Sequence, residues 1–259
     1  MIQPPNILIT GATSGLGREI ALQLAARGEH VLASGRRAER LAELETQSNI
    51  SGLKLDLSSS ENIASACNNM APLSGVILNA GITFVDNFSA GDFEIDSALI
   101  QTNVTANVQL IRELLPNLKQ SLNLKQKKGR ILIIASLGGM SPLPYQSVYA
   151  GTKAFMINFG LSLREEIKRD GVKVCVFAPG GIKTEMTDIP AMKGLEKELA
   201  PVEAVAAAAI KAYDKMPALS VPGTKNKLVA AVSKIAPRRF MASQAEKIYR
   251  KSRPGFNED

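Results

Sequence analysis

The stretch that decides the fold is Ile7-Leu8-Ile9-Thr10-Gly11-Ala12-Thr13-Ser14-Gly15-Leu16-Gly17. A short β-rich run leads directly into glycines at G-x-x-x-G-x-G spacing. Leu16, Ile20 and Leu24 then recur at helical spacing, and Gly28 stands where a helix C-cap is expected. The stretch therefore predicts a strand, a tight glycine turn and a helix.

Short apolar runs of strand type recur along the chain, with helix-compatible stretches between most of them. These runs are Ile7–Ile9, His30–Ser34, Leu53–Leu57, Gly75–Asn79, Arg130–Ser136 and Val172–Ala178. Strands that alternate with helices form βαβ units, so we expect a Rossmann-type α/β fold, a doubly wound parallel sheet with helices on both faces. An insertion from Asp92 to Leu124 is helical in pattern up to Pro116, and the Ala-rich Val202–Ala212 favours a helix.

Length and composition indicate a globular protein. With 259 residues, 45% of them hydrophobic, the chain can bury a large core, and residues 1–259 are expected to form a single domain. Two cysteines and a single histidine, His30, argue against a disulfide framework, a Ser/His/Asp hydrolase and any metal site. No signal peptide or membrane span is expected, so we predict a cytoplasmic protein.

Positive charge is concentrated near the end of the chain. The formal charge is +7, and residues 225–253 carry nine Lys/Arg and one acid. Leu228, Val232 and Ile235 share a helical face there, and Pro237 interrupts the pattern. This basic helical segment fits either a solvated helix or a contact with a membrane surface or an acidic carrier. No nucleic-acid partner is expected, because no binding motif accompanies the charge.

The glycine turn predicts a bound dinucleotide. Glycines at a strand-to-helix turn let the backbone approach a pyrophosphate, which binds the free N–H groups and dipole of the helix N-terminus. A tight turn that binds nothing is the alternative. The residues assigned to the cofactor here are Gly11, Thr13, Ser14, Gly15, Leu16 and Gly17.

The end of the second strand favours NADP(H) over NAD(H). An acid there would bind the adenosine ribose hydroxyls, whereas an arginine accommodates a 2′-phosphate. The chain has Gly35 followed by Arg36 and Arg37, which could also be solvated loop charges. Later strand ends that could border the cofactor supply Asp56, Leu57, Asn79, Ala80, Gly81, Pro179, Gly180, Ile182 and Thr184.

Tyr149 and Lys153 form a candidate acid/base pair. They are four residues apart at the start of an expected helix, so their side chains lie on one face. A tyrosine pKa of about 10 suits proton transfer near neutral pH poorly, but a neighbouring ammonium stabilises the phenolate and lowers the pKa. Ser136 ends the fifth strand, where its hydroxyl can hydrogen-bond a substrate carbonyl or simply form a serine turn.

These motifs, in this order and spacing, resemble those of the short-chain dehydrogenase/reductase family. The resemblance covers about residues 6–184 and rests on Thr10–Gly17, Asn79–Gly81, Ser136, Tyr149-x-x-x-Lys153 and Pro179-Gly180. It implies a sheet of about seven strands in the order 3-2-1-4-5-6-7, with the last near Leu219–Val221. Leu78 and Gly35 depart from the family's pattern.

The resemblance also implies roles and partners. Ser136 would orient the carbonyl, Tyr149 would act as acid/base, Lys153 would hold the ribose and lower the Tyr149 pKa, and Asn103 would relay protons. The enzyme would transfer a hydride between NADP(H) and a carbonyl or alcohol, as a homodimer or homotetramer. A dinucleotide-binding regulatory protein without catalysis is the alternative.

A substrate lid is expected over residues 185–217. Its first part, Glu185 to Ala200, carries Met186, Ile189, Met192, Leu195 and Leu199. Adaptable methionines and leucines suit a hydrophobic substrate, although an amphipathic helix packed on the core would have the same pattern.

Overall fold

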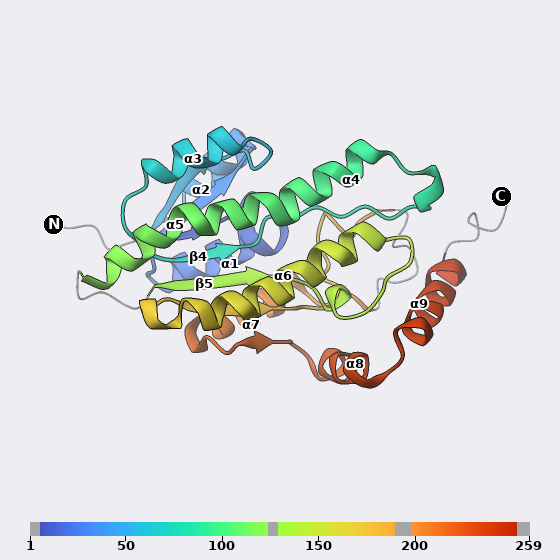
Figure 1. Ribbon diagram of the computed structural model, residues 1–259. Coiled ribbons are helices and arrows are strands. Elements are labelled where there is room, and N and C mark those ends of the chain that lie inside the picture. The colour runs from blue at the N-terminus through green and yellow to red at the C-terminus, as the bar shows by residue number, and fades with distance from the viewer. Residues whose placement is uncertain (1–5, 124–128, 190–197, 253–259) are drawn as a thin grey trace.

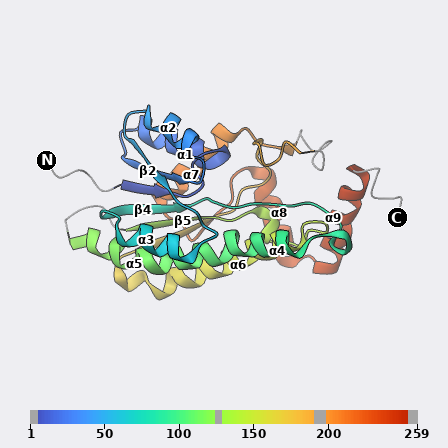
Figure 2. The same cartoon turned by 90° about the horizontal axis from the view of Figure 1, so that it is seen from above.

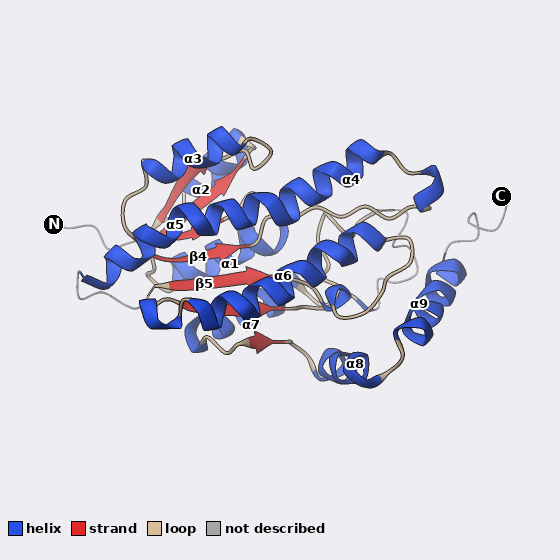
Figure 3. Cartoon of the chain, viewed as in Figure 1, coloured by secondary structure: helices blue, strands red, loops and turns tan. Residues whose placement is uncertain are grey.

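The computed structural model describes residues 6–123, 129–189 and 198–252, in which strands and helices alternate (Figures 1 and 3). The strands are β1 (Asn6–Ile9), β2 (Val31–Gly35), β3 (Ile50–Lys54), β4 (Leu73–Leu78), β5 (Arg130–Ile134), β6 (Lys173–Phe177) and β7 (Leu219–Ser220). The α-helices are α1 (Gly15–Ala26), α2 (Ala38–Glu45), α3 (Ser60–Asn68), α4 (Phe93–Ile100), α5 (Ala106–Asn123), α6 (Ser147–Glu166), α7 (Val202–Lys215), α8 (Thr224–Ile235) and α9 (Arg238–Ser252). Shorter turns are η1 (Phe88–Ala90), the π-helical η2 (Gln101–Thr105), η3 (Leu137–Gly139) and η4 (Lys168–Asp170).

The described strands form one seven-stranded sheet in the order β3-β2-β1-β4-β5-β6-β7, and neighbouring strands are parallel. This confirms the predicted Rossmann-type fold. Because side chains alternate along a strand, Ile7 and Ile9 enter the core under α1, α2 and α7, whereas Leu8 enters the core under α3, α5 and α6. Figure 2 shows these two helical layers on either side of the sheet. None of the helices in the described ranges is long and apolar enough to cross a membrane.

Helix α7 belongs to the core and corrects the predicted lid over residues 185–217. Ala206 and Ala209 are completely buried against the layer that contains α1. The Arg27 guanidinium of α1 also binds the Asp214 carboxylate of α7 at 2.7 Å. Small alanines allow close helix packing, so residues 202–215 are held on the sheet. Of the predicted lid residues, Met192 and Leu195 lie outside the described residues.

Strand β3 lies earlier than the predicted Leu53–Leu57. Its pairing with β2 runs from Val31 opposite Ile50 to Gly35 opposite Lys54. Leu55 and Leu57 are buried although they follow the last residue paired with β2. The alternating apolar pattern therefore extends past the end of the strand. The carboxylate of Asp56 accepts a hydrogen bond from the backbone of Ser58 and forms a turn there.

Helix α5 continues through Pro116, where the predicted helical pattern stopped. Proline removes a backbone donor and usually breaks a helix. Here Leu114 and Leu118, on either side of Pro116, are fully buried against the sheet. The Asn117 amide accepts a hydrogen bond from the Leu73 backbone N–H at 2.7 Å and so ties the same turn to β4. Tertiary contacts therefore override the local signal.

The ends of β1 and β4 are joined by side-chain hydrogen bonds at the point where the strand order reverses. The Thr10 hydroxyl accepts bonds from the backbone N–H groups of Asn79 and Ala80, both at 3.0 Å. The Asn79 amide donates to the carbonyls of Thr10 and Gly11 at 3.0 and 3.2 Å. Gly17 of α1 lies on this junction, because a Cβ there would be 2.3 Å from Asn79 Nδ2 and 2.4 Å from the Gly11 carbonyl oxygen.

We expect Gly17→Ala to lower the free energy of unfolding by about 2 kcal/mol or more, because the junction has no room for a methyl group. Urea denaturation measures this loss. Gly151→Ala is the matched control, since a Cβ at this exposed helical position meets nothing within 4 Å. Its stability should rise by about 0.5 kcal/mol or stay unchanged. Equal losses in the two variants would contradict the steric explanation.

Candidate active site

A pocket of about 1410 Å³ follows the carboxyl edge of the sheet. Ligands of open α/β sheets bind at this edge. The predicted site residues that line the pocket are Gly11, Thr13, Ser14, Gly15, Leu16, Arg36, Arg37, Asp56, Leu57, Asn79, Ala80, Gly81, Ser136, Tyr149, Lys153, Pro179, Gly180, Ile182 and Thr184. Gly17 and Asn103 are not among its lining residues, and Gly17 instead packs α1 onto the strand junction.

The glycine turn presents its backbone to the pocket. Gly11 and Gly15 adopt φ values of +65° and +51°, which side chains other than glycine rarely adopt. A Cβ on Gly11 would also lie 2.9 Å from the Cα of Ala80. The start of α1 is therefore held open toward the pocket, with its free N–H groups and positive dipole end available to an anion.

Three arginines gather where β2 meets α2. Arg36 and Arg37 are exposed as expected, and Arg40, which the sequence reading missed, joins them. Arg40 donates to the Thr13 carbonyl at 3.3 Å and pairs with the Glu185 carboxylate at 2.7 Å, while Arg37 lies 3.6 Å from the same carboxylate. The Arg40 guanidinium, with help from Arg37, holds the pKa of Glu185 below its usual range. The spacing Arg36-Arg37-x-x-Arg40 at a helix start was the available signal.

The acid position at the end of β2 is sterically closed. Gly35 stands there, and a Cβ on it would lie 2.5 Å from Cγ2 and 3.0 Å from the hydroxyl of Thr13. An aspartate or glutamate could not replace Gly35 while Thr13 keeps this position. The site therefore has cations where a ribose-binding acid would otherwise be.

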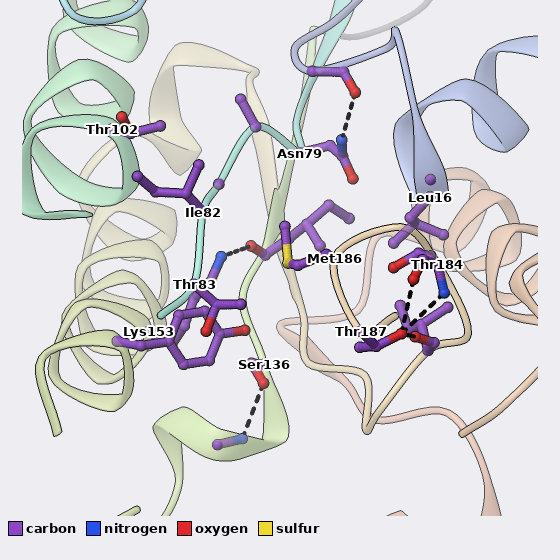
Figure 4. Close-up of a pocket in the computed structure, with 18 of the residues that line it drawn as sticks. Leu16, Asn79, Ile82, Thr83, Thr102, Ser136, Lys153, Thr184, Met186 and Thr187 are labelled. Atoms are coloured by element: carbon purple, nitrogen blue, oxygen red, sulfur yellow. Dashed lines mark hydrogen bonds between the residues drawn. The ribbon is translucent and has the colours of Figure 1, made fainter. Parts of the chain in front are cut away.

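Ser136, Tyr149 and Lys153 meet at the other end of the pocket. Ser136 caps η3 by accepting a hydrogen bond from the Gly138 backbone at 3.1 Å, so the serine-turn alternative describes part of its role. Lys153 is buried, and its ammonium donates to the Ile134 carbonyl at 3.2 Å and lies 5.8 Å from the centre of the Tyr149 ring. Figure 4 shows Ser136, Lys153 and Thr83 across the pocket from Leu16, Thr184 and Thr187.

Burial dominates the protonation of this pair. Burial raises the pKa of Tyr149, and its hydrogen bond with Ser136 opposes the rise. Burial also lowers the pKa of Lys153 to about 8. We expected Lys153 to bring the Tyr149 pKa below its ordinary value. In the structure the pKa of Tyr149 is raised instead, because its loss of water solvation is the larger effect.

Asn103 is a buried link between the pocket wall and α6. It lies in the π-helical turn η2, which interrupts the passage from α4 to α5. Its amide oxygen accepts from the Ile82 backbone at 2.8 Å, and its nitrogen donates to the Ile82 carbonyl at 2.9 Å and the Thr152 hydroxyl at 3.2 Å. A Cβ on Gly81 would lie 3.2 Å from both Asn103 Oδ1 and Lys153 Nζ, so these groups pack closely.

Helix α9 forms a pocket wall that the sequence reading did not predict. The Tyr249 hydroxyl donates to the Gln146 amide oxygen at 2.5 Å, and the Gln146 nitrogen donates to the Thr83 hydroxyl at 2.8 Å. All three residues line the pocket. Tyr145 anchors the same helix, because its hydroxyl bonds the Glu246 carboxylate at 3.2 Å. Gln146 directly precedes α6, so this series of hydrogen bonds connects α9 to α6, the helix that carries Tyr149.

The first part of the predicted lid does border the pocket. Met186, Ile189 and Leu199 line it, together with Val85 and Leu143 from other loops. Val85, Leu143 and Ile189 pack in one cluster with Tyr249, so this wall of the pocket is largely apolar apart from the polar groups of Thr83, Gln146 and Tyr249. Among the residues the structure describes, no group of three or more His, Cys, Asp or Glu side chains is placed to hold a metal ion.

Comparison with known proteins decides the family. A family model described as short chain dehydrogenase matches residues 5–193. The chain belongs to the short-chain dehydrogenase/reductase family. It is thus an NAD(P)-dependent oxidoreductase of this class.

Two relatives illustrate the similarity. An uncharacterized oxidoreductase of Myxococcus xanthus is 33% identical over 189 residues, which cover 70% of this short-chain dehydrogenase/reductase and 73% of the relative. Dehydrogenase/reductase SDR family member 7B of Xenopus laevis is 32% identical over 201 residues, which cover 72% of this chain and 61% of that longer protein.

Solved structures share the fold over most of the chain. A short chain dehydrogenase from Burkholderia cenocepacia in complex with NADP has a TM-score of 0.80 at 23% identity, covering 95% of this chain and 98% of that one. A short-chain dehydrogenase from Sphingobium yanoikuyae in complex with NADPH has a TM-score of 0.77 at 26% identity, covering 90% and 95%. A 3-ketoacyl-(acyl-carrier-protein) reductase from Brucella melitensis complexed with NADH has a TM-score of 0.75 at 21% identity, covering 85% and 97%.

The buried Lys153 predicts a specific pH dependence of stability. Its pKa falls from 10.5 to about 8 on folding, so the unfolded chain binds more protons between these values. The cost of the buried ammonium is complete below pH 8 and disappears as the pH rises to 10.5. Relative to Lys153→Met, the wild type should gain up to about 3 kcal/mol across this window. Urea unfolding of both proteins from pH 7 to 10.5 measures this gain, and a constant difference would contradict the assignment.

Proposed function

We propose that this short-chain dehydrogenase/reductase transfers a hydride between NADP(H) and a hydrophobic carbonyl or alcohol, with Tyr149 as the acid/base. The observation that carries the proposal is the meeting of Ser136, Tyr149 and Lys153 at one end of a pocket whose other end holds the arginines. Asn103 and the predicted site residues that line the pocket keep their assignments as part of this proposal, whereas Gly17 would act only by packing α1 against the strand junction.

The residues present fit NADP(H). The turn at Gly11 and Gly15 would hold the pyrophosphate, and Arg36 and Arg37 would bind the adenosine 2′-phosphate. The closed acid position at Gly35 supports the same preference. The Sphingobium yanoikuyae dehydrogenase, which is 26% identical, contains NADPH, whereas the NADH-bound Brucella melitensis reductase is similar in fold alone at 21% identity.

The chain's own groups would handle the carbonyl oxygen. Ser136 would hydrogen-bond this oxygen and Tyr149 would give it a proton as the carbonyl becomes an alcohol, with the reverse transfer in oxidation. The bound nicotinamide would supply or accept the hydride. Lys153 would hold the ribose, and its ammonium would favour the Tyr149 phenolate that remains after proton transfer. Asn103 would position the part of the pocket wall formed by Ile82, because it hydrogen-bonds both the Ile82 backbone and the Thr152 hydroxyl of α6.

The substrate is proposed to be a hydrophobic ketone, aldehyde or acyl chain. Met186, Ile189, Val85 and Leu143 line the same pocket as Tyr149 and offer apolar contacts, and adaptable methionine suits variable chains. A panel of hydrophobic and small polar carbonyls assayed with NADPH tests this choice. Turnover confined to small polar ketones or sugars would reject the hydrophobic class. A homodimer or homotetramer remains our expectation for the assembly.

Tyr149→Phe should lower turnover at least about 100-fold, because the proton donor is lost. Binding of NADPH, measured by fluorescence titration, should persist within about threefold, since the pocket keeps its shape. The matched control is Tyr213→Phe, which removes a hydroxyl buried in α7 away from the pocket and should retain activity. A protein that binds NADPH but turns over no carbonyl even as wild type would instead support a regulatory role.

Arg36→Gln combined with Arg37→Gln should weaken NADPH binding at least about tenfold, because charge-assisted hydrogen bonds to the 2′-phosphate are lost. Affinity for NADH should change little, since that cofactor has no such phosphate. Isothermal titration with both cofactors measures the ratio. Arg112→Gln, at an exposed position on α5, is the control. Parallel loss of NADPH and NADH affinity in the double variant would contradict the cofactor assignment.

A further inference from the structure

Helix α8 exposes apolar side chains that a helix of a globular protein normally buries. Leu228, Val232 and Ile235 lie on one stripe at i, i+4 and i+7, and their exposed fractions are 66%, 38% and 84%. The buried residue of α8 is Ala230, on the opposite side of the helix. The stripe therefore faces away from the core and is not covered by any residue in the described ranges, so it is available to a partner outside the molecule.

Cations border this stripe on both sides. At 100° per residue, Lys225 lies about 50° from the centre of the stripe on one side, and Lys227 and Lys234 lie about 105° and 125° from it on the other. Lys225 is also 3.7 Å from the Glu198 carboxylate, whereas Lys227 and Lys234 make no ion pair with a described residue. An apolar stripe between basic flanks is the pattern of a helix that lies in a lipid–water interface, with lysines at the headgroups and leucines among the acyl chains.

Helix α9 extends the same basic and apolar character. Phe240 and Ile248 are each 56% exposed. Arg238, Arg239 and Lys247 make no ion pair with any residue in the described ranges, and the same is true of Lys227 and Lys234 of α8. Both helices lie at the end of the molecule toward which the strands point (Figures 1 and 2). Their unpaired charge is therefore gathered on one end of the protein.

Both helices also contribute to the wall of the pocket. Val229 of α8 and Tyr249 of α9 line the pocket. Asn226 of α8 packs on the loop after β6, because a Cβ on Gly180 would lie 2.7 Å from its amide oxygen. A surface that covers the α8 stripe would thus border the pocket.

We propose that α8 and α9 dock on an anionic lipid surface, with Leu228, Val232 and Ile235 inserted below the headgroups. A second copy of the chain fits less well, because the unpaired cations of two copies would face one another and repel. An anionic bilayer supplies both partners that the helices lack, an apolar layer and a sheet of negative charge. Resting on the proposed function, a further consequence is that a hydrophobic carbonyl enters the pocket from the bilayer.

Flotation with vesicles tests the docking without reference to catalysis. The full chain should float with phosphatidylcholine vesicles that contain phosphatidylserine at low salt, and should float at least tenfold less with phosphatidylcholine alone or at high salt. Lys227→Glu with Lys234→Glu should reduce binding to the anionic vesicles at least tenfold. Lys173→Glu with Lys211→Glu, the same charge change at exposed positions outside α8 and α9, should leave binding within about threefold.

Insertion of the stripe is tested by fluorescence. The chain has no tryptophan, so Leu228→Trp introduces a single reporter. Its emission should shift to shorter wavelength with anionic vesicles, whereas Phe93→Trp on exposed α4 should show no shift. A shift that depends on protein concentration and occurs without vesicles would assign the stripe to self-association and overturn the proposal.

Two further outcomes would also overturn it: no flotation of the wild type at low salt, or equal loss of binding in the two charge variants. Failure of the proposed reductase activity is separate, because a protein that floats but reduces no carbonyl keeps the docking surface. A protein that reduces soluble carbonyls but never floats loses the docking surface alone.

Discussion

The hydrogen-bonded junction between the ends of β1 and β4 is the constraint on which the site depends. Thr10 and Asn79 satisfy one another's backbone groups where the strand order reverses, and Gly17 lets α1 lie directly on them. At this point the connection that follows β1 and the connection that follows β4 run to opposite faces of the sheet. A crevice lies between the two connections. The crevice follows from sheet topology, and the glycines keep it clear of side chains.

The pocket combines two electrostatic environments that are maintained in different ways. At one end, Arg36 and Arg37 remain in contact with water, so their charge costs little to keep. At the other, the Lys153 ammonium is surrounded by protein and its pKa is lowered, which opposes folding at neutral pH. The apolar cores on both faces of the sheet compensate for this cost, and such local conflict with stability is typical of sites built for chemistry.

Periodicity and glycine chemistry predicted the parallel sheet and the glycine turn at its edge, because these features are local in sequence, whereas the strand order came from the family resemblance. The prediction was wrong where tertiary contacts outweigh local pattern. Leu55 and Leu57 remain buried after the β3 ladder ends, and helix α5 continues through Pro116 because buried leucines hold both sides. The alanine-rich helix predicted over Val202–Ala212 does form, as α7, but it packs in the core with α1 instead of serving as part of the lid.

The site residues that could not be predicted from the sequence are held by contacts between distant parts of the chain. Arg40 and Glu185 are 145 residues apart, and Gln146 and Tyr249 are 103 apart. Residue spacing carries no information about such pairs. Tyr249 also has a consequence for how the protein can evolve. The glycine turn and Arg36 line the pocket from the first part of the chain, whereas Tyr249 lines it from α9, so a genetic crossover after β7 would exchange the α9 wall and leave the glycine turn and Arg36 intact.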